Sequence, residues 1–238
     1  MNGVLVRGHW LRAALLLLCL VLSACAAKVM EPLIVSGETV LIRGNITEAT
    51  ASEFKEALHR GRISRVLLAS GGGHVEPSLA IAKEIRALKI DVEVVGDCFS
   101  SCANYIFPAG ATKTISGLGV VAWHGNMSHL LHLHRSGKKP LLEVDHVLVT
   151  RLANIENEFF NDIGLDQYLC WFAKIEPYNV TNLYFLDAED MARFGLKDIK
   201  VRAGYARTDV SSYNTNGKNT LQYVKVDWSS IVRPENPR

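Results

Sequence analysis

The sequence predicts an α/β domain with parallel strands, and three observations point to it. After Glu31 the chain alternates short β-rich runs with segments of helical composition. An apolar run at 66–69 is broken by Ser-Gly-Gly-Gly at 70–73, and apolar residues at helical spacing follow over 79–88. Such alternation implies strands joined by helical crossovers. The 238 residues are enough for one substantial core, so we expect a single domain.

The same patterns place the individual elements. We expect strands at 40–43, 66–69, 92–95 and 120–123. We expect helices at 47–59, 79–88, 102–107, 141–163 and 187–194. Thr50 and Glu53 have the spacing of a capping box for the first helix. We therefore expect a linker at 25–34, a domain at 35–201 with a polar insertion at 125–140, and a polar tail at 202–238. We expect one added strand in the tail, at 221–226.

The N-terminus has the form of a secretory signal. Arg7 and Arg12 precede ten apolar residues, Ala13–Leu22, a run too short to span a bilayer. The segment ends in Leu-Ser-Ala-Cys, which is typical of a bacterial lipoprotein signal in which Cys25 is lipid-modified and becomes the new N-terminus. Ala26 gives no signal for retention at the inner membrane. We therefore expect a signal peptide at 1–24 and a lipid anchor on the periplasmic face of the envelope, at the outer membrane rather than the inner.

Charge argues against nucleic acid as a partner. Removal of residues 1–24 takes away Arg7 and Arg12, which lowers Lys+Arg from 26 to 24, equal to the 24 Asp+Glu. Nucleic-acid binding requires an excess of positive charge, which the mature chain lacks.

The cysteines fit an oxidising compartment. Cys19 leaves with the signal and Cys25 is the lipid site, so Cys98, Cys102 and Cys170 remain. Cys98 and Cys102, four residues apart at a loop-to-helix junction, are the expected bridge, and Cys102–Cys170 is the alternative. A zinc site on the C-x-x-x-C pair needs two further ligands, and the sequence offers none.

A glycine turn at 71–73 lies between an expected strand and an expected helix. Glycines allow a sharp turn whose N–H groups point outward, where they hold a phosphate or a developing oxyanion. The turn lacks the Lys-Ser/Thr of a nucleotide P-loop and the spacing of a dinucleotide fingerprint. A plain strand–helix turn is the alternative interpretation.

Four segments together resemble a known family. They are LLASGGGHVEPSLAIAKEI, VVGDCFSSCANYIFPAG, VVAWHG and FLDAEDMARFGLKD, within residues 35–200. Their order and content resemble the Clp protease proteolytic subunit and the wider Clp-protease/crotonase superfamily, with its spiral of strand–helix units. The two cysteines around the serines are similar to those of exported relatives. The resemblance implies a serine-type hydrolase without a cofactor, acting on peptides or proteins, and self-association through the long helix.

The resemblance also implies roles for individual residues. Counting back from Gly110, the nucleophile falls on Ser101, and Ser100 takes the place of a small residue. The histidine that accepts its proton falls on His124. The oxyanion donors fall on the backbone of Gly72 or Gly73 and of Cys102.

The third catalytic position departs from the family pattern. Where the family has an aspartate this sequence has Leu183. The neighbouring Asn182 carries an amide that can orient an imidazole, as in Cys-His-Asn enzymes. Asp187 is the other choice, although its place before the helix favours an N-cap.

A histidine group in the insertion has two readings. His129, His132 and His134, with His146, are residue types that bind zinc or copper. No carboxylate or thiol stands at ligand spacing, so we expect a solvated loop and no metal.

Taken together, the sequence predicts a lipid-anchored periplasmic serine hydrolase that works without ATP. The alternative is a non-catalytic binding or scaffold lipoprotein that keeps the fold without the orienting carboxylate. Acyl chemistry of the thioesterase or crotonase kind is a third reading, disfavoured because that branch lacks this Ser–His pair.

Overall fold

The computed structural model describes residues 33–206, 221–231 and 233. The expected signal peptide, Cys25 and nearly all of the linker lie outside these residues. No helix in the described part of the chain is long and apolar enough to cross a bilayer.

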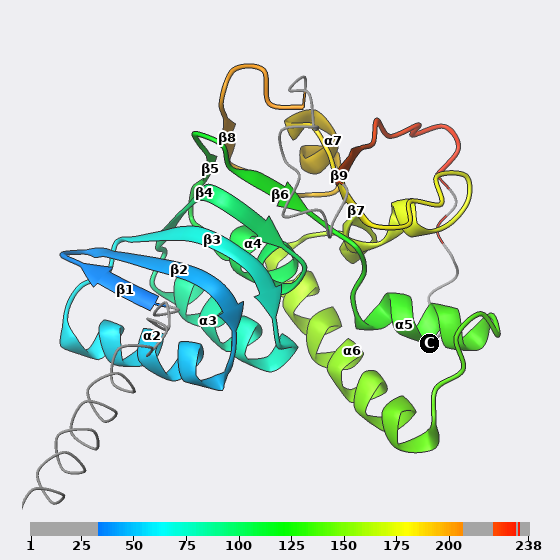
Figure 1. Ribbon diagram of the computed structural model, residues 1–238, viewed down its shortest axis with the longest axis horizontal. Coiled ribbons are helices and arrows are strands. Elements are labelled where there is room, and N and C mark those ends of the chain that lie inside the picture. The colour runs from blue at the N-terminus through cyan, green and yellow to red at the C-terminus, as the bar shows by residue number, and fades with distance from the viewer. Residues whose placement is uncertain (1–32, 207–220, 232, 234–238) are drawn as a thin grey trace, which may run out of the picture. The chain divides into compact units, whose positions relative to one another are not determined.

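The centre of the domain is a sheet of mostly parallel strands (Figure 1). The strands of the chain are β1 (Leu33–Ser36), β2 (Thr39–Ile46), β3 (Arg65–Gly73), β4 (Asp91–Phe99), β5 (Lys113–Ile115), β6 (Val120–Ala122), β7 (Leu183–Phe185), β8 (Ile199–Val201) and β9 (Leu221–Tyr223). The main sheet runs β1-β2-β3-β4-β5-β8, and β6 also pairs with β4. Within it β1 alone is antiparallel to its neighbour. The predicted α/β class with parallel strands is confirmed.

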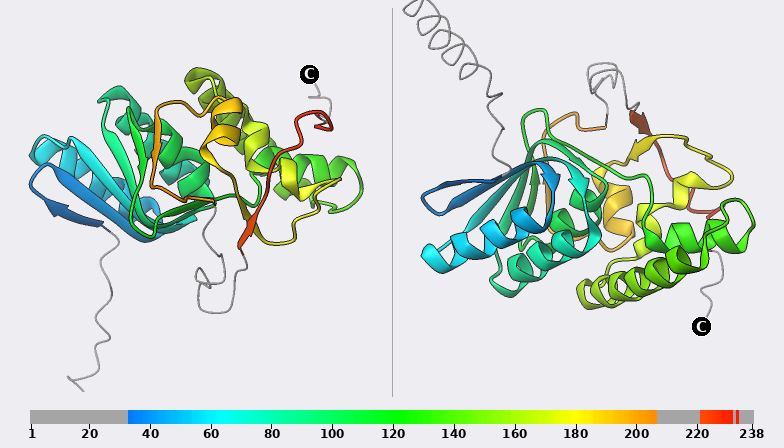
Figure 2. Two further views of the ribbon diagram at one scale, coloured as in Figure 1. Left: turned by 90° about the horizontal axis from the view of Figure 1, so that it is seen from above. Right: turned by 60° about the horizontal axis from the view of Figure 1, so that its bottom comes forward.

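The helices are α2 (Glu48–Arg60), α3 (Val75–Ala87), α4 (Phe107–Ala109), α5 (Met127–Arg135), α6 (Glu143–Ile163) and α7 (Ala188–Arg193), with a π-helix, η1 (Cys102–Ile106), and 3₁₀ turns η2 (Gln167–Cys170) and η3 (Phe172–Lys174). Helices α2 and α3 lie side by side on one face of the sheet, and α6 packs beside α3 and extends toward α5 (Figures 1 and 2). The capping box of α2 is formed by Thr47 and Thr50. The predicted box of Thr50 with Glu53 is therefore wrong by one helical turn.

Strand β4 has two different neighbours along its length, and this places the site. Val92–Val94 pair with β5, whereas Asp97–Phe99 pair with β6. The carboxyl ends of β4 and β6 therefore lie next to each other. Ser100, directly after β4, and His124, two residues beyond β6, come together across 24 positions of sequence.

The insertion differs from the sequence-based prediction, and the tail agrees with it in part. The insertion contains the helix α5, whose Leu131 packs on Val149 and Ala153 of α6. The described part of the tail adds β9 parallel to β7, as the prediction of a strand there anticipated. Beyond it Val224 and Val226 are buried in the main core, so this part of the tail belongs to the domain.

Candidate active site

A serine and a histidine meet at the carboxyl ends of β4 and β6. The Nε2 atom of His124 lies 2.8 Å from Oγ of Ser100. Both side chains line a cavity of about 220 Å³, whose wall also includes Gly71 and Phe99. A neutral imidazole at hydrogen-bond distance from a hydroxyl is the arrangement that general-base activation of a serine requires.

Ser100 occupies a strained turn between β4 and the π-helix η1. Its φ is +54°, in the left-handed region that non-glycine residues seldom adopt. Two backbone bonds hold the turn, from Ser100 N–H to the carbonyl of Ala122 at 3.2 Å and from Asn104 N–H to the carbonyl of Ser100 at 2.8 Å. A strained backbone of this kind persists only where surrounding contacts hold it in place, and such residues cluster at functional sites. π-Helical turns are also frequent at functional sites. The turn thus presents Ser100 to the cavity.

Ser101 faces a different direction. Its hydroxyl donates to the carbonyl of Gly73 at 2.7 Å, and the residue is only 4% exposed. The sequence-based prediction paired His124 with Ser101, and the structure places Ser100 there instead. The reason is the left-handed turn, because it reverses the chain after β4 and directs two successive side chains to opposite sides.

The glycine turn packs directly against the serine turn. Gly72 has φ +97°, and a Cβ on it would lie 2.7 Å from Cβ of Ser100 and 2.9 Å from the nitrogen of Ser101. Its N–H donates to Oγ of Ser70 at 3.1 Å. That N–H is therefore engaged, which corrects the prediction of Gly72 as an oxyanion donor.

Gly73 does not line the cavity, and Gly71 is the glycine of the turn that does. The N–H of His74, one residue after Gly73, donates to the carbonyl of Ile46 on β2. Peptide groups alternate along a strand, so those of Gly73 face away from β2 and toward the serine turn, where Ser101 contacts the Gly73 carbonyl. With Ser100 presented to the cavity, the following N–H is that of Ser101 rather than that of the predicted Cys102. As the first helical residue, Ser101 has an N–H without an intrahelical acceptor.

Backbone contacts on both sides fix His124. The preceding residue, Trp123, exchanges two backbone hydrogen bonds with Tyr184, of 2.8 and 2.9 Å. On the other side the Asn104 amide donates to the carbonyl of Gly125 at 2.9 Å. Since Asn104 also bonds to Ser100, this buried residue connects the two halves of the pair.

Among the residues that the structure describes, those that line the cavity beside His124 include a cation and no carboxylate. The remaining residues that line the cavity are Lys174, Thr181, Asn182 and Leu183. The ammonium of Lys174 donates to the backbone carbonyls of Thr181 and Asn182, at 2.8 and 2.9 Å. Desolvation, followed by the charge of Lys174, lowers the pKa of His124 below 6.5. His124 is therefore neutral at pH 7 and able to accept a proton.

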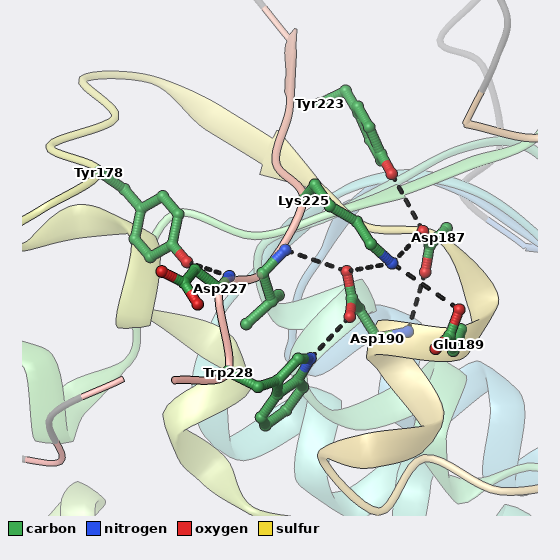
Figure 3. A network of polar contacts seen from close by, with 9 residues as sticks. Tyr178, Asp187, Glu189, Asp190, Tyr223, Lys225, Asp227 and Trp228 are labelled. Carbon is green, nitrogen blue, oxygen red and sulfur yellow. Dashed lines mark hydrogen bonds and ion pairs between the residues drawn. The ribbon is translucent and has the colours of Figure 1, made fainter. Parts of the chain in front are cut away.

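Asp187 is used elsewhere, as Figure 3 shows. Its carboxylate accepts the N–H of Asp190 at 2.8 Å and so caps α7. It also bonds to the Tyr223 hydroxyl and to Lys225, both at 3.0 Å. The N-cap prediction is confirmed, and Asp187 does not line the cavity. Of the two predicted orienting residues, only Asn182 lines the cavity with His124.

Below the serine turn the chain is cross-linked. Cys98 and Cys102 form the expected disulfide, and Cys170 is a buried thiol whose pKa is raised well above its usual value by desolvation. The bridge ties the last residues of β4 to the first of η1, on both sides of Ser100.

The histidines of the insertion are not a solvated loop. His129 is 7% exposed and stacks on Trp171, with ring centroids 5.4 Å apart, and His132 contacts the same indole. Burial is the main cause that lowers the pKa of His129 to about 4. His134 and His146 form a separate pair of rings. Among the residues that the structure describes, no three His, Cys, Asp or Glu side chains gather as a metal site requires.

Comparison with known proteins adds a distant structural likeness. No family model and no curated protein matches the chain. Among solved structures it is similar to a mutant of ClpP1 from Listeria monocytogenes, with 18% identity over 69% of this chain and 91% of that one, at a TM-score of 0.47. A likeness of this size does not assign a family, and the function proposed below rests on the geometry of the site.

Proposed function

We propose that the chain is a serine hydrolase in which His124 activates Ser100. The observation that carries this proposal is the 2.8 Å contact between His124 Nε2 and Ser100 Oγ at a left-handed turn of the backbone. A buried structural serine has no need of a strained backbone or of a histidine that lacks charge at neutral pH. Both features serve a nucleophile and its base.

The proposed chemistry is acyl transfer. The Oγ of Ser100 attacks a carbonyl carbon while Nε2 of His124 takes the hydroxyl proton, which forms a C–O bond and a tetrahedral oxyanion. The N–H of Ser101, the residue after the nucleophile, stabilises this oxyanion, and the glycine turn supplies a second backbone donor. His124 then gives the proton to the leaving nitrogen as the C–N bond breaks, and water repeats the cycle on the acyl-serine. Neither ATP nor a cofactor takes part.

Peptides or proteins are the proposed substrates. The resemblance of the four sequence segments to the Clp proteolytic subunit supports this class. The amide of Asn182 is the proposed orienting group for His124, since it lines the same cavity.

One specific observation favours a second candidate, a non-catalytic binding protein. The cavity holds Lys174 and Leu183 where a triad would have a carboxylate, and a cation beside His124 opposes the imidazolium that forms during attack. A scaffold that had lost its activity would tolerate this exchange, whereas an enzyme has to work with a weaker base.

The envelope location and the lipid on Cys25 are parts of the same proposal. They rest on the signal-like N-terminus, and acyl labelling of the wild-type chain but not of Cys25→Ala tests them. Self-association through α6 is also proposed. Its exposed Val144, Val147 and Leu148 share one helix face, and sedimentation of the wild-type chain as a monomer would contradict it.

Digestion of a peptide library tests the function itself. The full-length chain is compared with Ser100→Ala, and cleavage products are identified by mass spectrometry. Products that appear only with the wild type support the hydrolase. If wild-type digests match the Ser100→Ala background, the scaffold becomes the better account.

A further inference from the structure

A second cavity lies at the opposite end of the sheet from Ser100. It has a volume of about 580 Å³ and shares no lining residue with the cavity of the Ser–His pair. Gly110 and Ala111, which precede β5, form part of its wall, and Ala111 N–H donates to the carbonyl of Ile90 just before β4. Ser100 follows the other end of β4, nine residues along, so the length of one strand, roughly 30 Å, separates the two cavities.

The charged side chains that line this second cavity are mostly basic. Arg86, Lys89, Lys113 and Lys197 contribute positive charge, and Asp198 contributes the one negative charge. Arg86 is already paired, because its guanidinium donates to the carboxylate and the carbonyl of Asp162, each at 2.7 Å. The three lysines and Asp198 leave a net charge of about +2 on the walls at neutral pH.

Lys113 is the residue that makes this charge unusual. It is 5% exposed, and its ammonium donates to the carbonyl of Gly110 at 2.7 Å. No carboxylate of the described residues lies within 4 Å of it to form an ion pair. A buried ammonium has three donors and is costly without a counter-charge. The wall of the cavity therefore carries a buried ammonium that forms no ion pair with a described residue, and Asp198 compensates its charge only at longer range.

We propose that this cavity binds a phosphomonoester. A phosphomonoester carries close to two negative charges at pH 7, which complements the net charge of the walls, and its oxygens accept hydrogen bonds from ammonium groups. The volume exceeds what a bare phosphate fills and lies within the range of small-molecule sites. Pro108, Ile163, Leu165 and Leu196 provide an apolar side for the organic part of the ligand.

The electrostatics of Lys113 agree with this assignment. Desolvation lowers the pKa of Lys113, which Asp198 opposes in part. A phosphate bound beside the ammonium stabilises its charged form, and the rim lysines Lys89 and Lys197 contribute at longer range. Binding should accordingly weaken as salt rises.

Calorimetric titration of the full-length chain with glycerol 3-phosphate tests the proposal. We expect saturable binding, an increase in Tm with ligand concentration, and at least a tenfold loss of affinity in Lys113→Met. The double variant Lys89→Gln/Lys197→Gln alters only the rim and should also weaken binding, which keeps the test decisive if Lys113→Met folds poorly. Lys55→Gln, an exposed lysine on α2, is the matched control and should bind as the wild type does.

Further ligands separate the sources of the phosphate. Inorganic phosphate should bind more weakly than glycerol 3-phosphate, since it leaves the apolar side empty. Tighter binding of dioctanoyl phosphatidic acid would identify a lipid headgroup, and equal binding would identify a free phosphorylated metabolite. The absence of glycerol 3-phosphate binding at millimolar concentration would overturn the proposal. Equal loss of affinity in Lys55→Gln and in the rim variant would also overturn the proposal. It would show that the ligand is attracted by the overall positive charge of the surface rather than by this cavity.

Discussion

His124 and Ser100 lie 2.8 Å apart, between Nε2 and Oγ, although 24 residues separate them in the sequence. The contact depends on β4, whose last residues pair with β6 and so bring these two residues together. Ser101, the neighbouring serine, instead donates to Gly73 and holds the glycine turn against the serine turn. The two serines thus have separate tasks, one chemical in our proposal and one structural.

Gly72→Ala should destabilise the domain and abolish reactivity at Ser100. The added Cβ would lie 2.6 Å from the carbonyl of Phe99 and 2.7 Å from Cβ of Ser100. Overpacking of about 1–3 kcal/mol adds to a similar cost for alanine at positive φ. Gly117→Ala is the control, since Gly117 also has positive φ but has nothing within 4 Å of the new Cβ. Chemical denaturation measures both, and equal losses in the two variants would contradict the packing argument.

Lys174→Met should move the acid limb of the pH–rate profile to higher pH. Lys174 is one of the causes that lower the pKa of His124, so removal of its charge lets that pKa rise toward 6.5. His124 works as a base only when neutral, and the midpoint of the pH–rate profile should therefore increase. The variant also loses two hydrogen bonds to backbone carbonyls, which lowers the rate without moving the midpoint. An unchanged midpoint, with Lys55→Met as reference, would exclude the electrostatic role.

The free energy of unfolding of the domain should decrease as pH rises toward 7, because of the buried carboxyl of Glu156. This carboxyl is fully buried, receives the N–H of Met127 and the hydroxyl of Tyr105, and desolvation raises its pKa from 4.5 to about 7. The folded state therefore keeps a proton that the unfolded chain loses between about pH 4.5 and 7. Over that window the free energy of unfolding should fall by about 3 kcal/mol, at 1.36 kcal/mol per pH unit.

The comparison with Glu156→Gln isolates this effect from other titrating groups. Denaturation midpoints of both proteins are followed from pH 4.5 to 7.5. The stability of the wild type relative to the variant should decrease with pH across the window. A difference that stays constant or increases with pH would show that Glu156 is ionised in the folded state.

Reduction of the Cys98–Cys102 disulfide should slow any reaction at Ser100, with little loss of global stability. The bridge closes a loop of only a few residues, so its effect on the unfolded chain is small, yet it fixes both flanks of the turn. Non-reducing peptide mapping should find the link, and Cys170 should react with iodoacetamide only after unfolding, because it is buried. A Cys102–Cys170 link would contradict the structure.

Much of this architecture could be predicted from the sequence, because apolar periodicity reports burial directly. The runs at 66–69 and 92–95 lie within β3 and β4, and the long helix expected at 141–163 is α6. The short strands β5 and β8 were missed, since three residues carry too little pattern. Helix α5 was missed because its burial depends on stacking of histidines against a tryptophan distant in sequence.

The sequence analysis led to the same candidate site, although it chose the neighbouring serine. His124 and the glycine turn were identified, whereas the choice between Ser100 and Ser101 depends on a positive φ that no local sequence signal marks for serine. Asn104 and Lys174 gave no signal either, because each acts through backbone carbonyls that only the tertiary fold brings near. The spacing of the two cysteines was the available clue that the chain turns sharply between them.

Labelling with a fluorophosphonate probe tests the central claim most directly. The wild-type chain is compared with Ser100→Ala and with the matched neighbour Ser101→Ala, both checked for folding by circular dichroism, and the modified peptide is sequenced. We predict an adduct on Ser100 that disappears in Ser100→Ala and His124→Ala and persists in Ser101→Ala. An adduct on Ser101, or labelling that survives in Ser100→Ala, would contradict the assignment of Ser100 as the nucleophile.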